Sequence, residues 1–317
     1  MKKLTKQILC IVALSGFFIS FNASIFFTTT YRFINDFNGE MQAKSVEVSK
    51  FLPFDKDSGV VRKEGEKLTG ELPVIDGAAA LFPLFSSYVY RLYPESSIKY
   101  ENNDFTVDSK LVYSNTRGAY KGIVDGTRDI IFGVAPSKEQ LEYASSKGVE
   151  LQLTPIGHEA FVFLNNIKNP VKSLTKEQIK GMYSGKITSW KEVGGDNRIV
   201  CPVSRNKGSG SQTTMEKFMQ GEKMVSSTPF ALLGQSIGFS FRYYVEGLNS
   251  SSKVKMISVD GIEPSKENIQ NGTYPIISDI YMITRKGETN HNVQLFKDYV
   301  LSEEGQAILE EVGYVGV

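Results

Sequence analysis

Cysteine and histidine are both scarce in this chain of 317 residues, which contains two of each. Cys10 lies in an apolar run near the N-terminus and Cys201 far along the chain, so neither a disulfide framework nor a metal site is expected. His158 and His291 are the only histidines, and neither stands in a recognisable arrangement with a nucleophile that would make it the base of a hydrolase. We therefore expect no catalytic residue, no metal and no cofactor.

An excess of charge of either sign is also missing. The chain has 36 Lys and Arg against 35 Asp and Glu, and no continuous basic stripe with interleaved aromatic residues. Nucleic acid is therefore not an expected partner, and a small ligand is. With 41% hydrophobic and 22% charged residues the composition is globular, and the length predicts two lobes.

The first 31 residues predict an export signal or a membrane anchor. Lys2, Lys3 and Lys6 precede a stretch from Gln7 to Tyr31 that has no charged residue. At roughly 20 residues per bilayer crossing this stretch is long enough to span, which favours an uncleaved anchor. Residues 32–70 are weakly periodic and predict a stalk. The rest of the chain is expected outside the cytoplasm, anchored to the cell membrane or secreted.

A glycine-rich turn between a strand and a helix is the most informative stretch. Residues 198–203 are typical of a short strand, and the apolar residues after Gln212 have helical spacing. The first N–H groups of a helix lack internal partners and carry the positive end of its dipole, so an anion can bind there. Gly208 and Gly210 let the backbone approach a ligand closely. Ser209 and Ser211 offer hydroxyl donors, and the planar guanidinium of Arg205 is suited to an oxyanion.

The same unit of strand, small-residue loop and helix occurs twice more, with loops at 76–80 and 114–118. The predicted strands and extended segments are 72–75, 110–113, 129–134, 150–157, 159–165, 237–245, 254–259 and 273–284. The predicted helices are 81–93, 119–124, 137–146, 175–183, 265–270, 293–301 and 303–312, with capping boxes at Ser137 and Thr175. This alternation predicts an α/β fold with mixed, mostly parallel sheets flanked by helices.

Several of these segments, taken together and in order, are familiar. The succession VIDGAAALFPLFSSY, YSNTRGAYKGI, DIIFGVAPS, LTKEQIKGMYSGKITSWKEVGG, SRNKGSGSQT and NGTYPIISDIYMIT resembles the phosphate-binding proteins of bacterial phosphate ABC transporters, in their Gram-positive form. The resemblance covers nearly all of residues 72–317. It implies a two-lobed periplasmic-binding-protein type II fold that closes on an anion. Lobe 1 would comprise residues 71–160 and 275–317, and lobe 2 residues 161–274.

The resemblance also implies the ligand, the partners and the binding residues. The ligand would be inorganic phosphate, and the partners an ABC permease and its ATPase, with the body monomeric. The family's arginine and its following Ser-Gly-Thr fall on Arg205, Ser209, Gly210 and Ser211, and the hydroxyl of its second loop on Thr116. The Thr-Phe pair of its first loop falls on Leu81 and Phe82, so a hydroxyl is lost there and only backbone N–H groups remain.

A second departure concerns the choice between phosphate and sulfate. The family places an Asp directly after the strand that here reads DIIFGVAPS, and this segment has no carboxylate after Asp129. That Asp accepts the proton of hydrogen phosphate, which sulfate does not have. Asp76, Glu159 and Asp279 are candidates to replace it, although a structural or surface role is the commoner one for such carboxylates.

Two other functions stay open on the sequence. A serine hydrolase would use Ser209 or Ser211 as its nucleophile, but it needs a base, and GSGS does not match the GxSxG turn. An anchored sensory or scaffolding protein would keep the fold and bind a different ligand or none. The missing hydroxyl and Asp, together with the anchor, favour considering this second alternative.

Overall fold

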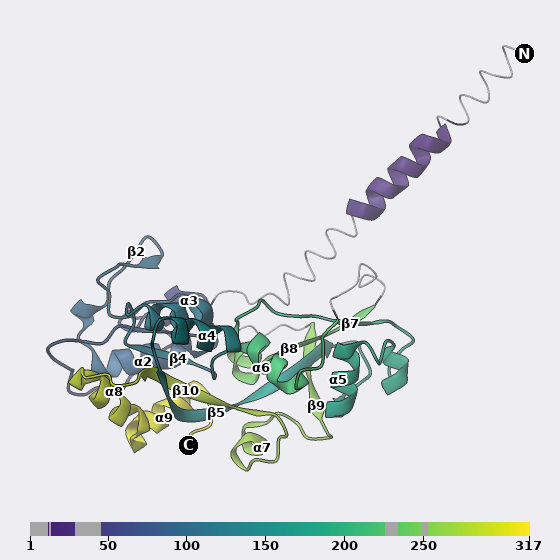
Figure 1. Ribbon diagram of the computed structural model, residues 1–317. Coiled ribbons are helices and arrows are strands. Elements are labelled where there is room, and N and C mark those ends of the chain that lie inside the picture. Colours follow the sequence, from purple (N-terminus) through teal and green to yellow (C-terminus); the bar gives the residue numbers. More distant parts are fainter. Residues whose placement is uncertain (1–11, 13, 29–45, 226–233, 249–252) are drawn as a thin grey trace, which may run out of the picture.

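The computed structural model describes residues 12, 14–28, 46–225, 234–248 and 253–317. Residues 14–28 form a helix with exposed apolar side chains, drawn in purple in Figure 1. Among the described residues, no helix combines the length and the apolar character needed to cross a membrane. Residues 1–11, 13 and 29–31 of the predicted anchor, and residues 32–45 of the predicted stalk, lie outside the described residues.

Residues 46–70, also predicted as stalk, pack on the body. The backbone N–H of Val61 donates to Ser87 Oγ at 3.0 Å, and the N–H of Leu68 donates to the Leu92 carbonyl at 2.7 Å. Val46 is buried in the same core cluster as the helix that carries Ser87 and Leu92. This part of the predicted stalk therefore belongs to the folded body.

The body has a mixed main sheet with the strand order β1-β4-β10-β5-β8-β7, to which β9 and β6 are added beside β5. Its strands are β1 (Ile75–Gly77), β4 (Ile130–Gly133), β5 (Leu151–Asn166), β6 (Ser173–Leu174), β7 (Val200–Pro202), β8 (Gln235–Phe241), β9 (Val254–Val259) and β10 (Ile277–Arg285). A separate hairpin joins β2 (Tyr100–Glu101) to β3 (Asp104–Phe105).

The helices flank this sheet (Figure 1). They are α2 (Phe82–Leu92), α3 (Asn115–Val124), α4 (Lys138–Ser146), α5 (Lys176–Ser184), α6 (Gly210–Met219), α7 (Lys266–Gln270), α8 (His291–Leu301) and α9 (Glu303–Val312). Short turns of other helix types are η1 (Val48–Phe51), η2 (Ala79–Leu81), η3 (Glu95–Ser97), η4 (Trp190–Val193) and η6 (Tyr244–Leu248).

Two long strands cross the middle of the molecule side by side. β5 and β10 pair antiparallel from Leu151–Arg285 to Ala160–Ile277, and both pair with further strands at other points along their length. The expectation of mostly parallel sheets is wrong, because these two crossing strands run opposite to their neighbours. Parallel pairing is confined to β1 with β4, β6 with β9 and β7 with β8 within the described sheet.

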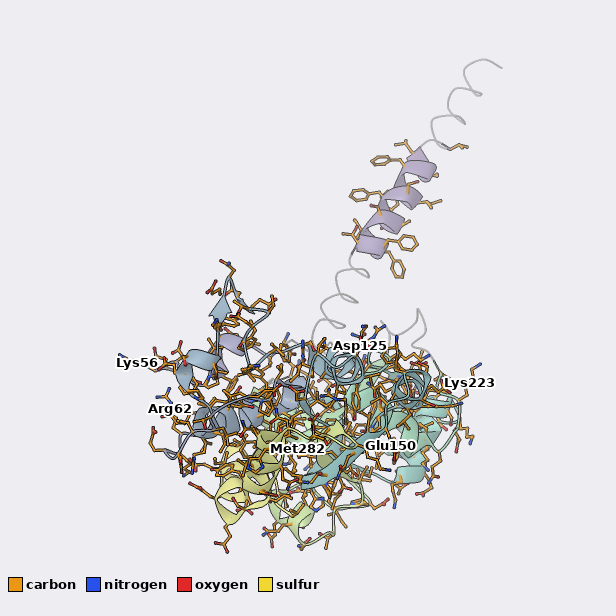
Figure 2. The ribbon with its side chains drawn as sticks, turned by 60° about the vertical axis from the view of Figure 1, so that its left-hand side comes forward. Lys56, Arg62, Asp125, Glu150, Lys223 and Met282 are labelled. Atoms are coloured by element: carbon orange, nitrogen blue, oxygen red, sulfur yellow. The ribbon has the colours of Figure 1, made fainter. Side chains whose placement is uncertain are left out.

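Buried side chains form separate cores on the two sides of this crossing. One core lies around α2, α8 and α9, where Phe85 stacks on Phe132 at 5.5 Å between ring centroids. A second lies around α5, α6, β8 and β9 and contains the fully buried Trp190. A smaller third cluster packs α3 and α4 against β4 on the side of the first core. Figure 2 shows Met282 of β10, also fully buried, among the packed side chains, with Lys56, Arg62 and Lys223 at the periphery. We call the two sides lobe 1 and lobe 2; the boundaries at 160/161 and 274/275 stay a prediction.

Local signals predicted most helices correctly. Both capping boxes are present, Ser137 with Gln140 and Thr175 with Gln178, and they begin α4 and α5 as expected. The predicted strand at 110–113 is wrong, because only Leu111 forms an isolated bridge, to Ile75. The two extended segments predicted around Gly157 form one continuous strand, β5.

Candidate functional site

A cavity of about 570 Å³ lies between the lobes and is lined by residues of both. The starts of three helical segments meet at it: η2 leading into α2, then α3, and finally α6. Helix N-termini carry unpaired N–H groups and partial positive charge, so three of them at one cavity favour an anion there. Six of the seven predicted site residues line this cavity, namely Leu81, Thr116, Arg205, Ser209, Gly210 and Ser211.

The loop before α6 is held in shape by Gln212, a buried residue of the helix's first turn. Its Oε1 accepts the backbone N–H of Arg205 at 2.9 Å, and its own N–H donates to Ser209 Oγ at 3.3 Å. Ser209 is thereby the N-cap of α6. Because its hydroxyl accepts this bond, its proton stays available for a ligand. The sequence did not indicate this role of Gln212.

The Arg205 guanidinium is partly buried beside Tyr244, and both residues line the cavity. Burial lowers the pKa of Arg205, while a hydrogen bond from the guanidinium to the Tyr244 side chain raises it. An arginine remains charged in proteins, so the cavity holds a cation that is poorly hydrated and fixed by a neighbour. Such a cation binds an anion more strongly than a solvated one does.

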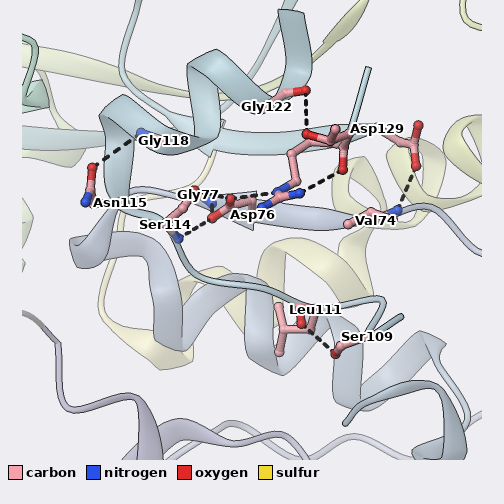
Figure 3. Close-up of polar contacts among 12 residues, drawn as sticks. Val74, Asp76, Gly77, Ser109, Leu111, Ser114, Asn115, Gly118, Gly122 and Asp129 are labelled. Atoms are coloured by element: carbon pink, nitrogen blue, oxygen red, sulfur yellow. Dashed lines mark hydrogen bonds and ion pairs between the residues drawn. The ribbon is translucent and has the colours of Figure 1, made fainter. Parts of the chain in front are cut away.

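The buried carboxylate of Asp76 holds the second loop, residues 114–118, in place, as the close-up in Figure 3 shows. Asp76 accepts the Ser114 backbone N–H at 2.9 Å and the Gly77 N–H at 2.7 Å, and pairs with Arg128 at 2.9 Å. Burial raises the pKa of Asp76 against these bonds. The network sets the position of Ser114, directly before the helix that presents Thr116.

α3 begins at Asn115, four residues earlier than predicted. Asn115 has a positive φ of 57°, and its side-chain oxygen accepts the Arg117 N–H at 3.0 Å. An asparagine tolerates this conformation, and from it the side chain satisfies an N–H group of the first turn, which the apolar periodicity cannot reveal. The early start brings Asn115, Thr116 and Arg117 to the cavity wall.

Leu81 and Phe82, the two residues predicted for the first loop, have different surroundings. Leu81 lines the cavity, together with Ala78, Ala79 and Ala80. Phe82 is fully buried in the core of lobe 1, where its ring meets Phe85 edge-on at 5.1 Å. Phe82 is thus outside the cavity lining, and any role of its backbone N–H in binding stays a prediction.

Of the three candidate carboxylates, only Glu159 lines the cavity among the described residues. Asp76 lies under the second loop as described above, and Asp279 is partly exposed and pairs with His158 Nδ1 at 2.9 Å. Glu159 is 2% exposed, and its burial raises its pKa to about 7 although Arg242 lowers it.

Other charged residues at the cavity were not among the predicted ones. Arg117 and Lys207 also line it, and Lys207 forms an ion pair with Glu139 in the first turn of α4. Gln140 Nε2 donates to the Gly208 carbonyl at 3.4 Å, so the loop before α6 touches lobe 1 twice. Cations thus outnumber carboxylates in the described lining.

Neither histidine lines the cavity. His158 pairs with Asp279 on β10, and His291 is the first residue of α8. In the described part of the chain, no three His, Cys, Asp or Glu side chains form a group that could hold a metal ion. The arrangement around Arg205 and Ser209 is suited to binding an anion by charge and hydrogen bonds.

Comparison with known proteins agrees with this geometry. The model of the PBP superfamily domain matches residues 74–304. The phosphate-binding protein PstS of Bacillus subtilis is 29% identical over 274 residues, 80% of this chain and 83% of that protein. PstS of Borreliella burgdorferi is 24% identical over 272 residues, 77% of this chain and 89% of that protein.

Solved structures share the fold. A Clostridium perfringens protein, described as a phosphate ABC transporter substrate-binding protein and solved with bound phosphate, has a TM-score of 0.58 at 23% identity, covering 80% of this chain and all of that one. An ABC-type phosphate transport receptor of Vibrio cholerae has a TM-score of 0.54 at 18% identity, covering 77% of this chain and all of that one.

Proposed function

Because this chain belongs to the PBP superfamily over residues 74–304, we propose that it is an extracytoplasmic substrate-binding protein that captures inorganic phosphate for an ABC transporter. It makes and breaks no bond. Its partners are an ABC permease and the ATPase that drives it, and its N-terminal segment tethers a monomeric body to the membrane. The PstS relatives support both the ligand and the transport role.

One observation carries this proposal: Arg205, Ser209, Ser211 and Thr116 line one cavity together with three helix starts. A tetrahedral oxyanion can accept hydrogen bonds from all of these groups at once. Hydrogen bonds to a charged partner are about twice as strong as neutral ones, and they are strongest where water is excluded.

Closure of the lobes would exclude that water. β5 and β10 connect the lobes across the cavity floor and are the segments about which they would turn. The loop before α6 reaches α4 through Lys207 and through the carbonyl of Gly208. Anion binding would draw the same loop toward the helix start at Thr116, so ligand and lobe contacts would favour the same closed state.

Calorimetric titration of the purified full-length chain with phosphate tests the proposal. We expect saturable, stoichiometric binding of one phosphate per chain. Absence of heat from folded, ligand-free protein would favour the sensory or scaffolding alternative. A turnover assay with a chromogenic phosphomonoester addresses the hydrolase alternative, since catalysis that is lost in Ser209→Ala would contradict a purely binding role.

A further inference from the structure

The cavity between the lobes is larger than inorganic phosphate requires. Its volume is about 570 Å³. A phosphate ion takes up no more space than a few water molecules, roughly 100 Å³. Cavities of roughly 300–1,000 Å³ are the usual size for sites that hold small organic ligands. The remaining space is therefore removed by further closure of the lobes, filled by water or occupied by a larger ligand.

Further closure is limited at the start of α6, because the lobes already touch there. Gly210 packs against Val134 and has Thr116 nearby. Lys207 of the same loop forms an ion pair with Glu139 of α4. These contacts are present while the cavity keeps its full volume. The space that a phosphate ion leaves empty therefore belongs to the part of the cavity farther from Gly210.

Large apolar and aromatic side chains from separate segments form part of the lining, which we call the apolar wall. Its members are Leu81, Tyr113, Tyr244, Ile280 and Tyr314. Leu81, Ile280 and Tyr314 are only 4%, 2% and 1% exposed, so the wall is a recess and not an open surface. Water gains little from contact with apolar side chains, so an apolar group of a ligand displaces it favourably.

The tyrosine hydroxyls of the apolar wall already have hydrogen-bond partners within the chain. Tyr314 donates to a backbone carbonyl of η2 at 2.6 Å. Tyr244 accepts a bond from the Arg205 guanidinium, and Tyr113 is bonded to the backbone of Val46. The wall therefore offers a ligand mainly the tyrosine rings. Such contacts suit an apolar or aromatic group better than one rich in hydroxyls.

Tyr244 connects the apolar wall to the anion site, because it is the residue bonded to Arg205. Tyr244 also lies close to Tyr113 of lobe 1: burial raises the pKa of Tyr113 to about 12, and Tyr244 contributes to this shift. An anion held by Arg205 therefore has aromatic rings of both lobes beside it. A phosphate group that keeps three free oxygens for Arg205 and the helix starts can carry a substituent on its fourth, next to these rings.

We propose that the cavity also binds phosphate monoesters that carry an uncharged apolar or aromatic substituent. The phosphate group occupies the anion site at Arg205 and the helix starts, and the substituent lies against the apolar wall. A charged substituent is excluded, because it would lose its water there without gaining a partner. The inference rests on the proposed function, since it uses the same anion site, and it extends the ligand class beyond the inorganic ion.

Calorimetric titration of the full-length chain at pH 8 tests this, with phenyl phosphate, methyl phosphate and inorganic phosphate as separate ligands. Both esters are freed of inorganic phosphate beforehand, and at this pH each carries a charge of about −2, so they differ only in the substituent. We expect phenyl phosphate to bind about tenfold more tightly than methyl phosphate, because its ring is removed from water. Inorganic phosphate should displace it. Phenyl phosphate that does not bind, binds no better than methyl phosphate or is not displaced overturns the inference.

Two variants of one residue locate the substituent. Tyr113→Ala removes a ring of the apolar wall and should weaken phenyl phosphate binding about fivefold, while the affinity for inorganic phosphate changes about twofold or less. Tyr113→Phe keeps the ring and is the matched control, so it should bind phenyl phosphate like the parent chain. Equal losses for phenyl phosphate and inorganic phosphate in Tyr113→Ala contradict a contact between the substituent and the wall.

The failure of this inference differs from the failure of the proposed function. Binding of inorganic phosphate without binding of phenyl phosphate leaves a phosphate receptor that rejects esters, and only the inference fails. Absence of binding by all three ligands removes both proposals. Binding of phenyl phosphate alone supports the ester site and contradicts the capture of inorganic phosphate. If Tyr113→Ala does not fold, the comparison of the two esters on the parent chain still decides, because it needs no variant.

Discussion

Gly210 packs directly against Val134 at the cavity, and a methyl group on Gly210 would come within 3.1 Å of a Val134 methyl carbon. Gly210 is the first residue of α6 on lobe 2, whereas Val134 follows β4 on lobe 1. The same methyl group would lie 3.8 Å from Thr116 Oγ1. The two lobes thus approach each other at a position where an added methyl group would crowd Val134.

Gly210→Ala should weaken phosphate binding about tenfold. Overpacking of this kind costs about 1–3 kcal/mol, and here it opposes the approach of the lobes. Isothermal titration of parent and variant measures the loss, and the double variant Gly210→Ala with Val134→Ala should recover most of it. Gly133→Ala is the matched control, because its methyl group would meet only Tyr120, at 3.8 Å. Equal losses in Gly210→Ala and Gly133→Ala would contradict the proposed contact.

Arg205→Ala should reduce phosphate affinity about 30-fold or more, while Ser211→Ala should cost about fivefold or less. The arginine contributes charge as well as donors from a partly buried position, whereas a serine contributes one neutral donor. Arg205→Lys should fall between them, since it keeps the charge and loses the planar fork. The control is Arg198→Ala, an exposed arginine before β7 that does not line the cavity. An Arg205→Ala variant that binds like the parent chain would exclude this cavity as the phosphate site.

Ser209 and Ser211 should differ in their effect on folding, although they flank the same glycine. Ser209 Oγ accepts the Gln212 N–H and caps α6. Loss of such a cap costs about 1 kcal/mol of unfolding free energy. Denaturant unfolding without phosphate should therefore show Ser209→Ala less stable by about that amount and Ser211→Ala close to the parent. Equal stabilities would mean that the cap contributes nothing and that Ser209 acts on the ligand alone.

Sequence signals that act over a few residues predicted the structure best. The capping boxes at Ser137 and Thr175 satisfy N–H groups within the first turn of their own helices, so no distant contact is needed to recognise them. β5 was predicted as two segments because Gly157 separates them. It is continuous because β10 pairs with it on both sides of this glycine. Tertiary pairing here overrides the local signal.

The sequence predicts the site residues that lie close together in one stretch. It does not predict those that only the packing of distant segments brings to the cavity. Arg205, Ser209 and Ser211 are close in the sequence, and the structure places all three at the cavity. The choice among Asp76, Glu159 and Asp279 depends on which carboxylate the packed chain leaves in the cavity wall. Asp76 is used to hold Ser114 and Asp279 to hold His158, and neither bond has a sequence signature.

Glu159 should make the ligand-free protein less stable as the pH rises. Burial raises its pKa in the folded state from 4.5 to about 7. Between these pH values the folded chain retains a proton that the unfolded chain has lost, so the folded state loses up to about 1.4 kcal/mol per pH unit. The stability that protonation supplies is complete below the unfolded pKa and is lost by about pH 7.

Glu159→Gln removes this titrating group and should flatten the pH profile. Urea unfolding at half-unit steps from pH 4.5 to 8, in buffers free of phosphate and sulfate, gives the slope for parent and variant. The difference between the two slopes should correspond to about one proton below pH 7 and vanish above it. Asp76, whose pKa burial also raises, remains in both proteins and cancels in this difference. Parallel profiles would mean that Glu159 is ionised in the folded state throughout the range, and that the pairing with Arg242 outweighs the loss of hydration.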